Sequence, residues 1–112
     1  MVLQNKKIKK LKGKKKFSNI SNASFVFKSD FLVLKLIKNE KIQHLEIAFA
    51  VSKKNFKRAV DRNRIKRLLR EAIKKNESNI RFSGHCLFLY KGSHIPDLSL
   101  LVKDVHSLIK NV

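Results

Sequence analysis

The sequence predicts an α+β protein in which one small sheet packs against a few helices. Residues 59–75 and 98–109 carry apolar side chains at the three- and four-residue spacing of amphipathic helices. Residues 31–37, 44–52 and 85–91 are apolar runs of strand length, bounded by polar turns. Because strands and helices are interspersed along the chain, we expect a layered α/β sandwich of one sheet and helices.

Size and charge narrow the class of partner. The chain has 112 residues, enough for one domain with a modest core, and 43% of them are hydrophobic, too many for a disordered tail. It carries 27 Lys and Arg against 8 Asp and Glu, a formal net charge of +19. A polyanion relieves the self-repulsion of so much positive charge. Nucleic acid is therefore the leading partner, and an anionic membrane surface is the alternative.

Targeting signals and cysteine use are consistent with a cytoplasmic protein. No apolar run approaches the roughly 20 residues that span a bilayer, and the N-terminus lacks the apolar segment of a secretory signal. The single Cys86 cannot form an internal disulfide, which suits a reducing compartment. We expect no membrane association.

The N-terminal region divides into an arm and the start of a domain. Residues 1–16 contain eight lysines and no acid, which predicts a flexible basic arm that contacts phosphate, or else a solubilising tail. Residues 17–112 are predicted to form a single domain. It begins with a short helix near Phe17, capped by Ser18 or Asn19, followed by an extended segment over residues 24–27.

The three apolar runs are predicted strands. Residues 31–37 are apolar on both faces, which is typical of a covered strand. In residues 44–52, large apolar side chains on one face alternate with smaller or polar side chains on the other face, which include Ala48 and Ala50. A polar turn at residues 39–41 joins these two runs, so we expect them to pair antiparallel. Residues 85–91 form a further strand, after which Asp97 is placed to cap the last helix.

The helix predicted over residues 59–75 has two unlike faces. Its apolar stripe is made of Ile65, Leu68, Leu69, Ala72 and Ile73. Eleven Lys and Arg lie between residues 53 and 75, interrupted only by Asp61 and Glu71. One face should enter the core while the other presents cations to a polyanion.

The chain shows no catalytic or metal-binding constellation of its own. Its acids are scattered without paired spacing, its four histidines lack ligand spacing, and it has no glycine-rich phosphate loop. Cys86 is expected to be a small core residue. We therefore assign no catalytic residue, no metal ligand and no organic cofactor. Arginine does suit RNA, because the guanidinium group binds phosphate bidentately and stacks on bases.

The signature of a known family occupies the basic helix. The run Arg62-Asn63-Arg64, followed by Ile65-Lys66-Arg67 and by Arg70-Glu71, closely resembles the signature of the protein subunit of bacterial ribonuclease P. The preceding double lysine, Lys53-Lys54, also fits this family. The strong similarity covers about 25 residues, and a looser similarity in element order covers residues 11–110.

The resemblance implies a fold and an activity. The family fold is an α/β sandwich with a small mixed four-stranded sheet and three helices, in the order α-β-β-β-α-β-α, with a left-handed βαβ crossover. The family's RNA subunit is the catalyst and uses magnesium to remove the 5′ leader of precursor tRNA. The protein binds that RNA and the leader, as a monomer in a one-to-one complex, and supplies no catalytic side chain.

The resemblance also assigns site residues. The residues that would face the RNA subunit are Lys53, Lys54, Arg62, Asn63, Arg64, Lys66, Arg67 and Arg70. Phe17 and Lys91 would belong to the cleft that holds the leader, between the sheet and the first helix. Ser21 and Leu34 stand where family members often carry aromatic residues. Magnesium would enter through the RNA subunit and the substrate.

Other readings of the same features are a ribosomal-type structural RNA-binding protein, a DNA-binding helix-turn-helix protein and a membrane-surface protein. A helix-turn-helix needs a scaffold helix and a short turn before the basic helix, whereas here a strand and a basic loop precede it. The membrane reading needs bulky insertion residues, whereas the apolar stripe of this helix is typical of a core. The structural RNA-binding protein remains the alternative, and the Arg-Asn-Arg signature favours ribonuclease P.

Overall fold

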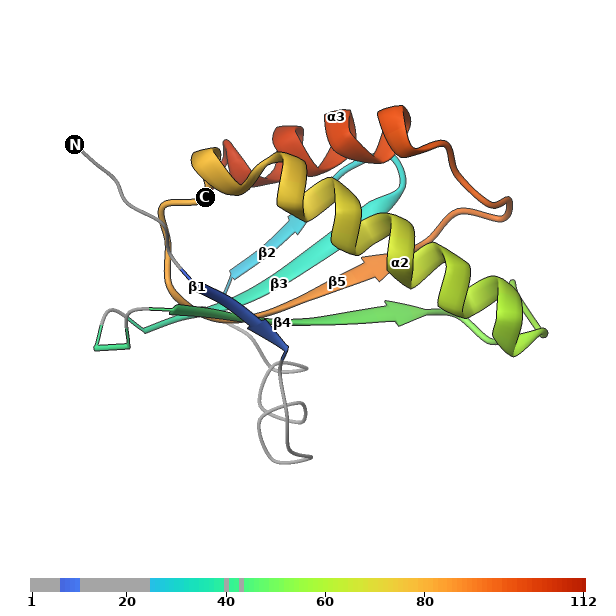
Figure 1. Cartoon of the computed structure of the whole chain (residues 1–112), viewed down its shortest axis with the longest axis horizontal. Helices are drawn as coiled ribbons and strands as arrows, with labels where there is room; N and C mark the ends of the chain where they lie inside the picture. The colour runs from blue at the N-terminus through green and yellow to red at the C-terminus, as the bar shows by residue number, and fades with distance from the viewer. Residues whose placement is uncertain (1–6, 11–24, 40, 43) are drawn as a thin grey trace.

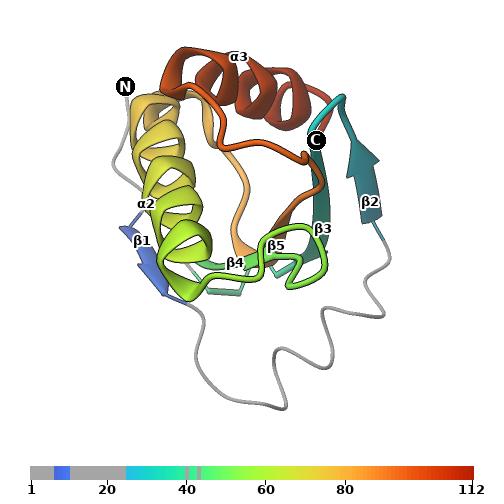
Figure 2. The ribbon, with the colours of Figure 1, turned by 90° about the vertical axis from the view of Figure 1, so that its right-hand side faces the viewer.

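A five-stranded mixed sheet carries two α-helices on one of its faces in the part of the chain that the structure describes (Figures 1 and 2). This computed structural model describes residues 7–10, 25–39, 41–42 and 44–112. The elements are β1 (Lys7–Lys10), β2 (Phe25–Lys28), β3 (Leu32–Lys38), β4 (His44–Val51), α2 (Ala59–Lys75), a 3₁₀ turn (Glu77–Asn79), β5 (Gly84–Tyr90) and α3 (Leu98–Ile109). The predicted α+β class is confirmed.

Strand β5 lies at the centre of the sheet. The strand order is β1-β4-β5-β3-β2, with β5 parallel to β4 and antiparallel to β3. Both faces of β5 carry buried apolar side chains: Cys86 and Phe88 on one side, and Leu87 on the other. A strand of this kind is best accommodated between two neighbours.

The expected antiparallel pairing of residues 31–37 with residues 44–52 is therefore wrong, because β5 lies between them. The connection that leaves β3 is bound to the start of β5 instead: the backbone N–H of Asn39 donates to the Ser83 carbonyl at 3.1 Å, and Ser83 Oγ donates to the Asn39 carbonyl at 3.0 Å. Gly84 has φ +131°, and a Cβ there would stand 2.1 Å from the Ile37 carbonyl oxygen. Glycine is required for this close approach.

The sheet has five strands rather than the four expected. The additional strand, β1, comes from the predicted basic arm and pairs parallel with β4, with Ile8 opposite Leu45. Ile8 is partly buried and packs against the core, which gives this short lysine-rich strand an apolar anchor. The helix predicted near Phe17 lies outside the described residues, so the expected total of three helices and the boundary at residue 17 remain predictions.

The connection from β4 through α2 to β5 is left-handed. In Figure 2, β4 and β5 both run toward the viewer, and α2 lies above the sheet. The chain leaves β4, passes through α2 above the sheet, and re-enters the sheet at β5, on the right of β4. In this view, a connection above the sheet that leads to a strand on the right is left-handed. Crossovers between parallel strands are right-handed in about 98% of cases. This arrangement places α2 over β4 and β1, and it leaves room for α3 over β3 (Figure 2).

The apolar stripe of α2 enters the core, as predicted. Ile65, Leu69, Ala72 and Ile73 are buried, and Leu68 packs at the margin. Asn76, at the end of α2, is also buried, and its Nδ2 donates to the Ala72 carbonyl at 3.0 Å and to the Val102 carbonyl at 3.1 Å. This amide joins α2 to α3. Asp97 stands at the N-cap position of α3, but its side chain forms no capping hydrogen bond.

The described helices leave the other face of the sheet uncovered. That face carries Ala48, Ala50, Ile37 and Leu87, which form a small apolar cluster separate from the main core. Among the described residues, no helix combines the length and the apolar character needed to cross a bilayer.

Neighbouring residues on α2 provide a test of the orientation of the helix. Replacing Leu69, which is fully buried, with alanine should lower the free energy of unfolding by about 2–5 kcal/mol, because apolar packing in the core is replaced by a cavity. Arg70→Ala, one residue later on the exposed side, should lower it by no more than about 1 kcal/mol, because the exposed cation–π contact of Arg70 with Phe49 is the interaction it loses. Urea unfolding measures both values, and equal losses would show that α2 is rotated from this position.

Candidate nucleic-acid interface

The cations of α2 lie opposite its buried stripe. Of the residues that the sequence placed toward RNA on this helix, Asn63, Arg64, Arg67 and Arg70 are exposed, whereas Arg62 and Lys66 are partly buried. In a helix, successive residues are rotated by about 100°, so burying the stripe directs these side chains toward solvent. The helix thus presents several cations to solvent, with Asp61 and Glu71 as its acidic residues.

The loop before α2 presents the double lysine. Lys53 and Lys54 are exposed, while Phe56 is buried with its ring centroid 6.1 Å from that of Tyr90. The backbone N–H of Phe56 donates to the Ser52 carbonyl at 3.0 Å, and that of Lys54 donates to Ser52 Oγ at 3.2 Å. The loop is anchored on both sides of the two lysines, so their ammonium groups extend from a defined turn.

Arg62 has a structural contact as well as a charge. Its Nη1 donates to the carbonyl oxygens of Phe56, at 2.8 Å, and Lys57, at 2.9 Å. The guanidinium group therefore binds the loop to the first turn of α2. Arg64 is exposed on the same turn. The two arginines of the signature consequently differ: Arg62 holds the loop in place, and Arg64 is oriented toward solvent.

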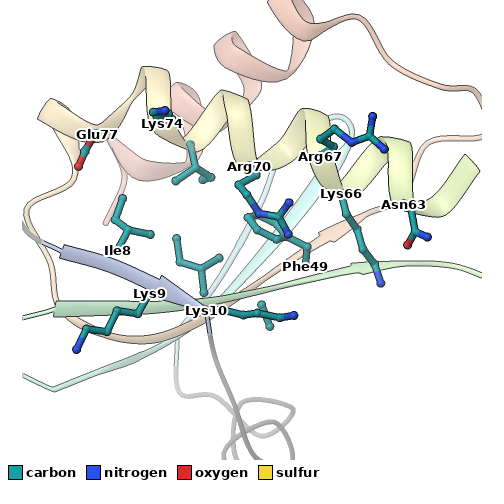
Figure 3. Close-up of a pocket in the computed structure, with 13 residues that line it drawn as sticks. Ile8, Lys9, Lys10, Phe49, Asn63, Lys66, Arg67, Arg70, Lys74 and Glu77 are labelled. Atoms are coloured by element: carbon teal, nitrogen blue, oxygen red, sulfur yellow. The ribbon is translucent and has the colours of Figure 1, made fainter. Parts of the chain in front are cut away.

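A groove of about 740 Å³ separates α2 from the edge formed by β1 and β4 (Figure 3). Its lining brings together four residues from the predicted RNA-facing set, Asn63, Lys66, Arg67 and Arg70, with lysines from β1. The cations that line it are Lys9, Lys10, Lys66, Arg67, Arg70 and Lys74, and Glu77 is the acid among the lining residues. Such an excess of positive charge favours a phosphate-bearing ligand.

An aromatic ring lies under one of these cations. The Arg70 guanidinium carbon is 5.8 Å from the centroid of the Phe49 ring, a cation–π arrangement, and Phe49 is in turn stacked against Phe88 at 6.3 Å (Figure 3). Sequence reasoning missed Phe49, Ile8 and Lys10 as groove residues. The alternation of residues 44–52 did place Phe49 on the side of the core, but pairing it with Arg70 requires the position of α2.

The residues predicted for the leader cleft are only partly described. Lys91 is exposed directly after β5, and its backbone N–H donates to the Phe31 carbonyl at 2.8 Å. Phe17 lies outside the described residues, as does Ser21, so the cleft between the sheet and a first helix stays a prediction. Leu34 is fully buried on the side of the sheet that faces the helices. It therefore does not line the uncovered face.

On the uncovered face of the sheet, the carboxylate of Glu46 lies close to two histidines. Glu46 Oε2 lies 2.8 Å from His44 Nε2, and its Oε1 lies 3.4 Å from His85 Nε2. The carboxylate thus joins β4 to β5 across the sheet. Within the described residues, no three His, Cys, Asp or Glu side chains are grouped so as to hold a metal ion.

Cys86 behaves as a core residue, as expected. Its side chain is fully buried on the helix side of β5, and desolvation raises the pKa of the thiol well above its usual range. The thiol therefore stays protonated at neutral pH, which makes it a poor nucleophile.

Comparisons with known proteins identify a family whose sequences this chain resembles. The family model for ribonuclease P matches residues 5–112. The ribonuclease P protein component of Coprothermobacter proteolyticus is 37% identical over 84 residues, which cover 75% of this chain and 66% of that protein. That of Chlorobaculum tepidum is 30% identical over 120 residues, covering 90% of this chain and 77% of that protein. The chain thus spans about two thirds of the length of the first of these relatives.

Solved structures show that the fold is shared. The ribonuclease P protein of Staphylococcus aureus superposes with a TM-score of 0.77 at 23% identity, covering 91% of this chain and 93% of that one. The ribonuclease P protein of Thermotoga maritima superposes with a TM-score of 0.80 at 18% identity, covering 93% of this chain and 97% of that one.

The different surroundings of the two signature arginines lead to a prediction. Arg62→Ala should lower the free energy of unfolding by about 1 kcal/mol, because its two hydrogen bonds to the loop are removed. Arg64→Ala should leave the free energy of unfolding unchanged within about 0.5 kcal/mol. Chemical denaturation of the two variants beside the wild type provides the measurement. A larger decrease for Arg64→Ala than for Arg62→Ala would contradict these roles.

Proposed function

The chain belongs to the ribonuclease P protein family, and from this premise we propose that it is the protein subunit of a ribonucleoprotein endoribonuclease that matures the 5′ end of tRNA. It binds the catalytic RNA subunit and the 5′ leader of precursor tRNA. The observation that carries the proposal is the orientation of α2, which buries its apolar stripe and turns the signature residues outward. This is the arrangement that a docking helix for RNA requires.

In this proposal, α2 and the loop before it bind the RNA subunit. Lys53 and Lys54 extend from an anchored turn, and Arg64 and Arg67 are exposed on the adjoining helix. Arginine can hold a phosphate with two parallel hydrogen bonds, and lysine contributes a point charge. Each phosphate contact should steepen the salt dependence of binding by about 0.7–0.9 log units per log unit of salt.

The leader of precursor tRNA lies along the uncovered face of the sheet. Support for this placement comes from the small side chains of Ala48 and Ala50 beside Leu87, which leave a shallow apolar surface. Lys91 follows β5 at the edge of this surface and is exposed. By the family resemblance, Phe17 is the aromatic residue of the leader cleft and stacks on a leader base.

The chemistry of cleavage belongs to the RNA subunit, with magnesium ions held by that RNA and the substrate. The protein reduces the need for magnesium, because its lysines and arginines neutralise phosphates that otherwise require counterions. It acts in the cytoplasm as a monomer bound to one RNA subunit. The net charge of +19 supports this electrostatic role.

Reconstitution with a bacterial ribonuclease P RNA tests the proposal. At a magnesium concentration too low for the RNA alone, addition of the protein should restore release of the 5′ leader, measured by gel analysis of labelled precursor tRNA. The protein without RNA should release none. Cleavage by the RNA-free protein would contradict the assignment of the chemistry. Failure to stimulate any such RNA would favour a structural RNA-binding protein.

A charge-matched pair of variants tests the docking surface. Arg64→Gln combined with Arg67→Gln should weaken binding to the RNA subunit and lower the magnitude of its salt slope by about 0.7–0.9 for each phosphate that is no longer neutralised. Lys103→Gln combined with Lys110→Gln removes the same charge from exposed positions on and after α3. Filter binding over a salt series measures both. An equal decrease in affinity for the two variants would show that net charge, not α2, determines affinity.

A further inference from the structure

We propose that the groove between β1 and α2 holds one unpaired nucleotide of the bound RNA, with its base against Phe49 and Arg70 and its phosphates at the lysines of the rim. The inference rests on the proposed function, in which α2 docks on RNA. It adds that the docked RNA presents an extruded base at this place.

The groove has two walls of different origin. Strand β1 forms one wall, and alternation along it separates its side chains: Ile8 and Lys10 are opposite Leu45 and Ile47 on the side of α2, whereas Lys9 lines the outer margin of the groove and its side chain extends away from the helix (Figure 3). Helix α2 forms the other wall. A segment near the N-terminus and a helix in the middle of the chain therefore enclose one space.

The floor of the groove is apolar and partly accessible. Ile47 and Ile73 are buried beneath it, with 3% and 2% of their surface exposed, whereas Ile8 and Phe49 are only partly buried although they pack on the core. The groove volume of about 740 Å³ lies within the range of about 300–1,000 Å³ typical of small-ligand sites. A flat ring could cover this exposed apolar surface.

The rim carries the charge that phosphates need. Lys10 projects along it from β1 and Lys66 descends from α2 toward β4, while Lys74 lines the groove farther along the helix (Figure 3). Arg70 lies between rim and floor, with its guanidinium group over the Phe49 ring. A guanidinium plane stacks on a nucleobase as well as on an aromatic ring. Arg70 can therefore extend the stack from Phe49 to a base.

An unpaired nucleotide fits these features better than a duplex or an acidic peptide. A duplex keeps its bases paired, so only its phosphates would reach the rim and the apolar floor would stay unused. An acidic peptide would likewise engage the cations without requiring the Phe49–Arg70 stack. Proteins that recognise RNA commonly bind unstacked bases on aromatic side chains and arginine planes, with cations on the adjoining phosphates.

The test compares two RNA hairpins that differ by one bulged nucleotide, at one fixed salt concentration. The wild-type protein should bind the bulged hairpin more tightly by roughly fivefold to a hundredfold, as expected for one stacked base. Phe49→Leu removes the aromatic face, and Arg70→Lys removes the planar group while keeping the charge. Each should reduce the preference for the bulge severalfold, measured for each variant as the ratio of its dissociation constants for the two hairpins.

Matched controls separate the groove from general effects. Phe25→Leu changes a phenylalanine on β2, at the opposite edge of the sheet from β1. Like Phe49, Phe25 makes a cation–π contact: Lys38 Nζ lies 5.1 Å from the centroid of its ring. Arg81→Lys changes an exposed arginine that does not line the groove. Both controls should retain the full preference. If Phe49→Leu unfolds the protein, Arg70→Lys decides the matter, because Arg70 is exposed on α2.

The outcomes distinguish the two levels of the proposal. Tight but equal binding of both hairpins by the wild type would overturn the nucleotide groove and leave the RNA-binding function standing. Binding of neither hairpin would overturn the RNA-binding function and the groove with it. A preference that survives in both Phe49→Leu and Arg70→Lys would show that the bulge is bound elsewhere.

Discussion

Burial of one stripe of α2 determines where the signature residues of this protein lie. Ile65, Leu69 and Ala72 are fully excluded from solvent, and each buried large aliphatic side chain contributes about 1.5–3 kcal/mol. Rotating the helix by a single residue would expose this stripe and bury guanidinium groups in its place, which is far more costly. The core thus fixes the direction of Arg64, Arg67 and Arg70 although none of them belongs to it. An interface made of long, flexible side chains gains its order from apolar packing on the far side of the helix.

The sheet order determines which surfaces accompany that helix. Because β5 lies between β4 and β3 and the crossover is left-handed, α2 is placed over β4 and the edge strand β1 (Figure 2). That position brings Arg70 over Phe49 and gives the groove its second wall. The same topology puts both described helices on one side of the sheet, and Ala50 and Leu87 belong to an apolar cluster apart from the main core on the other side. Two chemically different faces are thereby available for RNA.

The features predicted well from the sequence are those that depend on local periodicity. The helical spacing of Ile65, Leu69 and Ile73 was sufficient to orient α2, and the strands β3, β4 and β5 were found within a residue or two. Strand neighbours were not predictable in this way, because the pairing of β5 with both β3 and β4 depends on interactions between distant segments. Strand β1 escaped notice since Ile8 is its one apolar residue among lysines. The groove, which needs β1 and α2 together, was beyond local reasoning for the same reason.

The central place of β5 has a consequence for the order in which the molecule is assembled on the ribosome. Strands β3 and β4 emerge early, yet they share no hydrogen bonds with each other and are joined only through residues 84–90. Until that segment is synthesised, the nascent chain holds two strand edges without their native partner, a state that favours pairing with foreign chains. Such non-local pairing also slows folding, since loops must close before their contacts form. The sheet therefore becomes continuous only after most of the chain has been made.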